Sequence, residues 1–83
     1  MRKILEKAIE EYNRYRSPEV TAKLKAIAEG RFKVEFTGPF CSTCGFYDYF
    51  DDFRYVLLGI GVKSRIARVV ELDEGAVVEF ELE

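Results

Sequence analysis

Residues 62–82 read VKSRIARVVELDEGAVVEFEL and carry the clearest folding signal in the chain. The first half is rich in β-branched side chains, which favour strands. The second half alternates apolar with polar residues, as in a strand that has one buried and one solvated face. Between them, Asp73-Glu74-Gly75 is typical of a hairpin turn that needs glycine at a left-handed position. The stretch therefore predicts a β-hairpin with one wet face.

A third strand is predicted over residues 32–37, before Gly38-Pro39, a pair that stops regular structure. These residues alternate strictly between apolar and polar side chains, so this strand also has one solvated face. A sheet that is solvated on one face carries its helices on the other, which makes an α+β sandwich of two layers. The polar residues expected on the wet face are Lys33, Glu35, Glu79 and Glu81.

Three helices are predicted from the spacing of apolar residues. An amphipathic helix occupies the start of the chain and ends near Arg14 to Arg16. Ser17-Pro18-Glu19 is typical of a helix start and Gly30 of a helix end, so a second helix is expected over residues 18–29. Aromatic residues at helical spacing predict a third helix over residues 43–58.

The predicted order is helix, helix, strand, helix, strand, strand, with a small three-stranded sheet and the helices on one face. No internal repeat is evident in the sequence. The chain has 83 residues, of which 48% are hydrophobic, so it is expected to form a single α+β domain over residues 1–83.

Composition excludes several classes of function. The formal net charge is −2, which argues against a non-specific nucleic-acid or membrane binder, and we expect no nucleic-acid partner. The chain has no His, so chemistry based on histidine is excluded. Charges interrupt the first residues and no apolar run could span a bilayer, so a cytoplasmic location is expected. The lack of Gln and the wealth of Lys, Arg and Glu resemble the composition of thermophile proteins.

The candidate reactive residues of the sequence are Cys41 and Cys44, which are separated by Ser42 and Thr43. The pair lies between a predicted strand and a predicted helix, and a thiol at a helix N-terminus is favoured as thiolate. A spacing of three residues allows the sulfurs to form a disulfide or to share a metal ion. We therefore expect Cys41 and Cys44 to be the catalytic residues of a thiol–disulfide couple, in which Cys41 attacks and Cys44 resolves the mixed disulfide.

Two other interpretations of the cysteines stay open. They can be a structural pair, either bridged or as buried thiols. They can also bind zinc, but zinc needs four ligands and one chain offers two cysteines, with Asp48 as the nearest carboxylate. A symmetric dimer would complete a four-cysteine site. No cofactor is expected otherwise, and the sequence does not decide whether the protein is an enzyme.

The stretch from Phe36 to Cys44 resembles the active-site corner of thioredoxin-like proteins, in which a strand delivers a Cys-x-x-Cys motif to the start of a helix. The resemblance implies a redox role for Cys41 and Cys44 and a β-hairpin later in the chain. It is local, because Ser42 and Thr43 replace the usual Gly-Pro, no Trp precedes Cys41, and no proline follows Pro39.

Aromatic residues concentrate in the third predicted helix, and one buried stripe cannot hold all of them. The aromatic helix is therefore expected to contact a second copy of the chain, as a homodimer, or another protein. The alternative function is accordingly a non-enzymatic interaction module. Three aspartates of this helix, Asp48, Asp51 and Asp52, are interpreted as a solvated face whose charge opposes a thiolate at Cys44. The aromatic residues expected at the interface are Phe46, Tyr47, Tyr49 and Tyr55.

Overall fold

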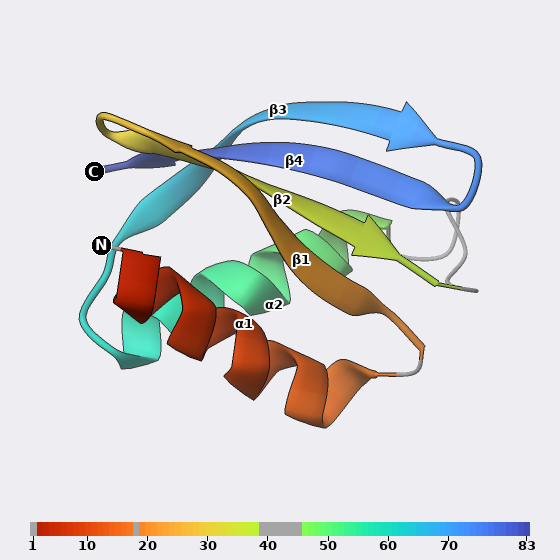
Figure 1. Ribbon diagram of the computed structural model, residues 1–83, viewed down its shortest axis with the longest axis horizontal. Helices are drawn as coiled ribbons and strands as arrows, with labels where there is room; N and C mark the ends of the chain where they lie inside the picture. The colour runs from red at the N-terminus through yellow and green to blue at the C-terminus, as the bar shows by residue number, and fades with distance from the viewer. Residues whose placement is uncertain (1, 18, 39–45) are drawn as a thin grey trace.

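The computed structural model describes residues 2–17, 19–38 and 46–83. Figure 1 shows two layers, a twisted antiparallel sheet and a pair of helices that cover one of its faces. The elements follow in the order α1 (Arg2–Arg16), β1 (Thr21–Ala28), β2 (Arg31–Thr37), α2 (Phe46–Gly59), β3 (Ser64–Leu72) and β4 (Gly75–Leu82). The predicted α+β class with helices on one face is thus confirmed.

The sheet has four strands in the order β1-β2-β4-β3, and each neighbouring pair is antiparallel. Its outer face is the wet face that the sequence predicts. On that face Glu81 of β4 forms ion pairs with Arg31 of β2 and Arg65 of β3. The third-strand and hairpin predictions are confirmed as β2, β3 and β4, with Asp73 and Glu74 in the turn.

The core is a single cluster between the sheet and the helices. Aromatic rings dominate it, and Phe53 of α2 contacts the rings of both Phe36 and Phe80 at centroid distances of 5.9 and 5.4 Å. Such packing buries large apolar areas, which is the main source of stability in a chain this short. The buried apolar residues are Leu5, Ala8, Tyr12, Val20, Ala22, Phe32, Val34, Phe36, Phe50, Phe53, Leu57, Ala76, Val78 and Phe80.

The predicted helix over residues 18–29 is wrong, because Thr21–Ala28 is strand β1. Together with β2 it forms a hairpin, so the sheet has four strands rather than three and the molecule has two helices among the described residues. A β-bulge lies between Leu24 and Ala26. The extra residue shifts the alternation, so that Leu24 and Ile27 both pack against the core. Their spacing of three residues therefore imitates a helix.

The elements repeat once along the chain, although no internal repeat is evident in the sequence. Helix, strand and strand occur first as α1, β1 and β2 and then as α2, β3 and β4. The second strand of each unit pairs with its counterpart at the centre of the sheet. Two antiparallel helices lie beneath, one from each unit (Figure 1). The molecule therefore has an approximate internal two-fold symmetry.

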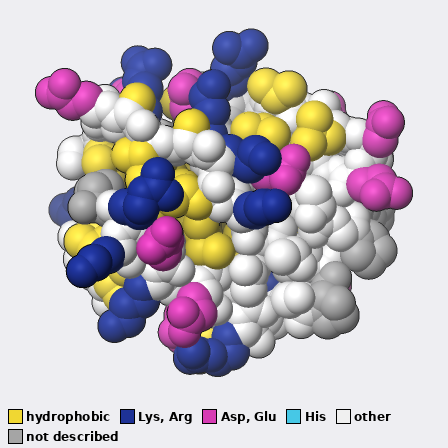
Figure 2. All heavy atoms as spheres, in the orientation of Figure 1, with side chains coloured by type: hydrophobic (Ala, Val, Ile, Leu, Met, Phe, Trp, Pro, Cys, Tyr) yellow, Lys and Arg dark blue, Asp and Glu magenta, His cyan; other side chains and the backbone are white. Residues whose placement is uncertain are grey.

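The two helices otherwise agree with their predictions. Helix α1 ends at Arg16 and buries Leu5, Ala8 and Tyr12. Helix α2 begins at Phe46 and ends at Gly59, and the first residues of its predicted range, 43–45, lie outside the described part of the chain. Among the described residues no helix combines the length and the apolar character needed to cross a membrane. On the face drawn in Figure 2, basic and acidic side chains are interspersed over α1.

Candidate functional site

Cys41 and Cys44 lie outside the described residues, but the elements on either side of them are described. Strand β2 ends at Thr37 and helix α2 begins at Phe46, so the motif falls between a strand end and a helix start, as predicted. The strand before the motif and the helix after it are both present, and the hairpin β3–β4 follows. Around it the sheet is wholly antiparallel, since both neighbours of β2 run against it.

Backbone contacts on two sides fix the end of the strand that precedes the cysteines. The amide of Gly38 donates a hydrogen bond to the carbonyl of Glu74 at 3.2 Å. On its other side Gly38 approaches the backbone of Glu19 so closely that a Cβ atom would lie 2.3 Å from that carbonyl oxygen. The chain therefore leaves the sheet from a fixed point before it enters the Cys-x-x-Cys segment.

Arginines neutralise two of the three aspartates that were interpreted as a solvated face. Asp52 is half-buried and forms an ion pair with Arg16 of α1, and Asp51 pairs with Arg54 at 3.0 Å. The solvated-face interpretation is thus correct for Asp48, which is exposed in the first turn of α2, and wrong for Asp52. Less negative charge opposes a thiolate at the start of α2 than the sequence suggested.

A polar junction joins α1 to the first half of α2. The Arg16 guanidinium lies 5.5 Å from the ring centre of Tyr49, which is a cation–π contact. The hydroxyl of Tyr12 donates to the carbonyl oxygen of Tyr49 at 2.8 Å. Burial raises the pKa of Tyr12, because a phenolate would lose its hydration in the core. Tyr49 is therefore half-buried against α1.

An apolar groove of about 420 Å³ runs between α1 and α2 on the side away from the sheet. Tyr15 of α1 and Tyr55 of α2 line it with 74% and 65% of their surfaces exposed. Ile60, which is 43% exposed, follows at the end of α2, and Lys7 and Glu11 lie along the α1 side. Exposed aromatic surface around a groove is typical of sites that bind another molecule.

The structure separates the residues that the sequence assigned to an aromatic interface. Tyr47 and Tyr55 are exposed, at 58% and 65%, whereas Tyr49 is half-buried. Phe46 is the first residue of α2. Tyr15 belongs to the groove and was missed, because it stands at the end of another helix. It stands three residues after Tyr12 and seven after Ala8, at helical spacing, and this was the signal in the sequence that could have identified it.

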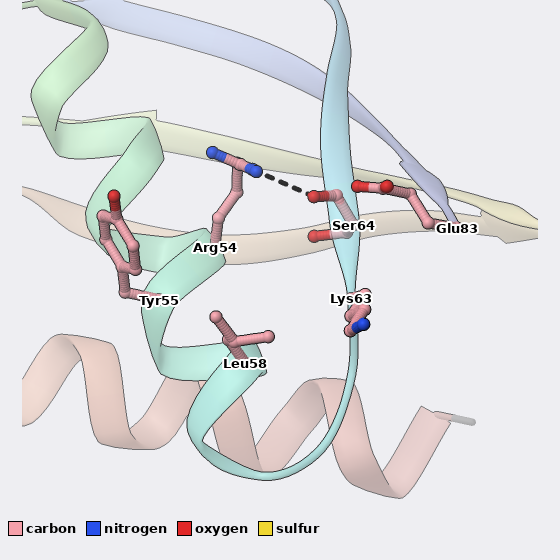
Figure 3. Close-up of a pocket in the computed structure, with 6 residues that line it drawn as sticks. All are labelled: Arg54, Tyr55, Leu58, Lys63, Ser64 and Glu83. Carbon is pink, nitrogen blue, oxygen red and sulfur yellow. Dashed lines mark hydrogen bonds between the residues drawn. The ribbon is translucent and has the colours of Figure 1, made fainter.

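A second, smaller hollow of about 220 Å³ lies between the C-terminal half of α2 and the start of β3 (Figure 3). Arg54 of α2 donates from Nε to the carbonyl oxygen of Ser64 at 3.0 Å. The Ser64 hydroxyl is buried and has no hydrogen-bond partner in the described part of the chain. Lys63 and Glu83 border the same hollow with opposite charges.

Among residues 2–17, 19–38 and 46–83, no group of three or more potential ligands could hold a metal ion. The predicted zinc ligands Cys41 and Cys44 lie outside that part of the chain. Asp48, the nearest carboxylate, is exposed.

No protein-family description, no curated protein and no solved structure matches this chain.

Proposed function

We propose that the protein is a small thiol–disulfide redox domain of the cytoplasm whose active groups are Cys41 and Cys44. The observation that carries the proposal is the position of the pair between the end of β2 and the first turn of α2. The first amides of a helix have no partners within the helix, and together with the helix dipole they favour a nearby thiolate. The pairing of Asp51 and Asp52 with arginines supports the proposal, because it removes part of the opposing charge.

The proposed reaction is a two-electron exchange. The Cys41 thiolate attacks one sulfur of a substrate disulfide, and the other substrate sulfur leaves as a thiolate and takes up a proton. The Cys44 thiolate then attacks the Cys41 sulfur of the mixed disulfide. This step forms the Cys41–Cys44 disulfide and releases the second substrate thiol. The substrate gains two electrons that the protein loses, and a thiol reductant restores the dithiol.

The test uses oxidised glutathione as the disulfide and measures thiol release. Cys41→Ser should abolish exchange, and Cys44→Ser should stop at a mixed disulfide that mass spectrometry detects as added glutathione. Asp48→Asn should raise the rate at pH 7 about two- to fivefold by lowering the pKa of the thiol, whereas Asp51→Asn, whose charge is already paired, should not. A Cys41→Ser variant with full exchange activity would contradict the proposal.

Native mass spectrometry of the protein, purified without reductant or chelator, separates the other interpretations of the cysteines. A dimer that carries one zinc ion would indicate a shared four-cysteine site and exclude redox catalysis. A metal-free chain lighter by two hydrogens would establish the disulfide, and its reduction potential would then distinguish a working couple from a structural bridge.

A second candidate function is a protein-interaction module. The observation that favours it is the exposure of Tyr15 and Tyr55 at the groove between α1 and α2. Exposed tyrosine contributes little to the fold, whereas tyrosine is enriched at the centres of protein interfaces. The dye bis-ANS probes this surface, and wild-type protein should enhance its fluorescence more than Tyr55→Ser. Equal enhancement by both proteins would show that the groove is not an apolar binding surface.

A further inference from the structure

We infer that the groove between α1 and α2 binds a second copy of this chain, around a two-fold axis that sets the two α1 helices antiparallel. The inference depends on the second candidate function and names its partner. It is independent of the redox proposal, because no residue that it uses belongs to the cysteine segment.

The monomer leaves an apolar surface exposed at the groove. Tyr15, Tyr55 and Ile60 border one groove, yet all three lie outside the core cluster of the fold. An aromatic residue that contacts another protein buries a large area at a small cost in side-chain entropy. The groove therefore offers an aromatic anchor site where α1 and α2 meet.

The charges beside the groove are complementary to those of a second copy. Lys7 and Glu11 lie one helical turn apart on the α1 side of the groove, which places opposite charges about 6 Å apart along the helix axis. A second α1 that runs antiparallel, with its midpoint near residue 9, sets Lys7 against the second copy's Glu11. The two-fold axis repeats this pair in the reverse direction, so both charges of both copies are matched.

The charges also explain why the partner is a copy of the chain. Within its own chain Lys7 forms no ion pair among the described residues, while Glu11 pairs with Arg14 at 3.3 Å and is still partly exposed. A surface with one free cation beside one accessible anion is complementary to itself. A strongly acidic or basic partner would meet a like charge at one of these two positions.

The interface is expected to be small, because the groove covers only part of one face of a molecule with principal extents of 29 × 24 × 18 Å. Interfaces below about 1,200 Å² of total buried area usually belong to weak or transient complexes. We therefore expect a dimer with a dissociation constant of about 10–100 µM. By RT ln Kd this corresponds to a binding free energy of about −7 to −5 kcal/mol.

Sedimentation equilibrium of the reduced full chain between 10 µM and 1 mM measures the association. Tyr55→Ser should weaken the dimer at least tenfold, whereas Tyr47→Ser should leave it unchanged. The two residues are a matched pair, because both are exposed tyrosines of α2 and Tyr47 does not line the groove. Circular dichroism confirms that each variant is folded.

Charge reversal tests the two-fold geometry itself. Lys7→Glu should weaken the dimer about five- to tenfold, and Glu11→Lys should do the same. The double variant, Lys7→Glu with Glu11→Lys, should return to within about twofold of wild type, because each charge again faces its opposite across the axis.

Three results would overturn the inference. They are a monomer at 1 mM, a dimer that Tyr47→Ser weakens as much as Tyr55→Ser does, and a double charge reversal without recovery. A monomer at 1 mM whose Tyr55→Ser variant loses bis-ANS fluorescence would contradict self-association alone. A monomer whose fluorescence does not change would contradict the interaction module as well.

Discussion

Val34 and Val78 are direct partners across the antiparallel pair β2 and β4 at the centre of the sheet. Each is the first residue of the same tripeptide, Val34-Glu35-Phe36 and Val78-Glu79-Phe80. In both tripeptides the valine and the phenylalanine are buried and the glutamate lies on the outer face. The internal two-fold symmetry of the fold is thus visible at residue level, although only this short segment preserves it in sequence.

The two-fold symmetry identifies Ser64 as the counterpart of Val20. Val20 stands two residues before the β1 residue that pairs with Phe36, and Ser64 stands two residues before the β3 residue that pairs with Phe80. The Ser64 hydroxyl is buried without a partner among the described residues, which costs free energy. Ser64→Ala should leave the free energy of unfolding unchanged or raise it by up to about 1 kcal/mol. Val20→Ala should lower it by about 1–3 kcal/mol, because it empties core volume. Urea titration measures both, and a large loss of stability in Ser64→Ala would show that the hydroxyl is bonded.

Tyr12 should make the fold sensitive to alkali. Its pKa is raised by burial, so the stability that it contributes is fully present below about pH 10, the ordinary tyrosine value, and is lost as the pH rises above it. Tyr12→Phe loses the hydrogen bond to Tyr49 and should cost about 1 kcal/mol at pH 7.

The same variant should lose less stability than wild type between pH 9 and pH 11. The measurement is the free energy of unfolding in urea at several pH values, for both proteins. Parallel pH curves for wild type and variant would contradict the role of Tyr12.

Gly75 should be irreplaceable at the start of β4. Its φ is 155°, and a Cβ atom there would lie 1.8 Å from the carbonyl oxygen of Phe36, which belongs to the neighbouring strand. Gly75→Ala must push the two central strands apart and should lower the free energy of unfolding by more than about 2 kcal/mol.

Gly59 is the matched control for this substitution. It ends α2, and a Cβ atom there would meet nothing within 4 Å. Gly59→Ala should therefore be neutral or raise the melting temperature slightly, because alanine loses less backbone entropy in a helix. Equal melting temperatures for the two alanine variants would contradict the steric argument.

Glu81 should contribute to stability only above the acid range. The hydrogen bond from Arg65 and its charge, with a smaller effect of Arg31, lower the pKa of Glu81. A lowered carboxyl pKa gives stability that is present above the ordinary glutamate value of about 4.3 and is lost as the pH falls below it. Glu81→Gln should therefore melt below wild type at pH 7 and approach it towards pH 3. The pairs are exposed, so the difference is expected to be small and to shrink further in 1 M NaCl.

Much of the fold follows from local pattern alone. Strict alternation in β2 and β4 fixed which face is wet, and the helical spacing of Leu5, Ala8 and Tyr12 located α1. The exposure of Tyr47 and Tyr55 was also predictable, because one buried stripe of α2 could not include them. The position of Cys41 and Cys44 between a strand and a helix was predictable too, because it needs only the elements on either side of the pair.

Tertiary structure decided the identity of β1 and the composition of the groove. Residues 21–28 are good helix formers by composition, but the edge of β2 offers a complete set of backbone hydrogen-bond partners, and the bulge after Leu24 turns Ile27 to the core. No local pattern could reveal that Tyr15 and Tyr55 face one groove, since α1 and α2 meet only after the sheet has set them side by side. Local sequence thus determined the period and the polarity of each element except β1. Long-range backbone pairing determined that β1, which lacks a clear period in the sequence, is a strand. It also determined which side chains lie together.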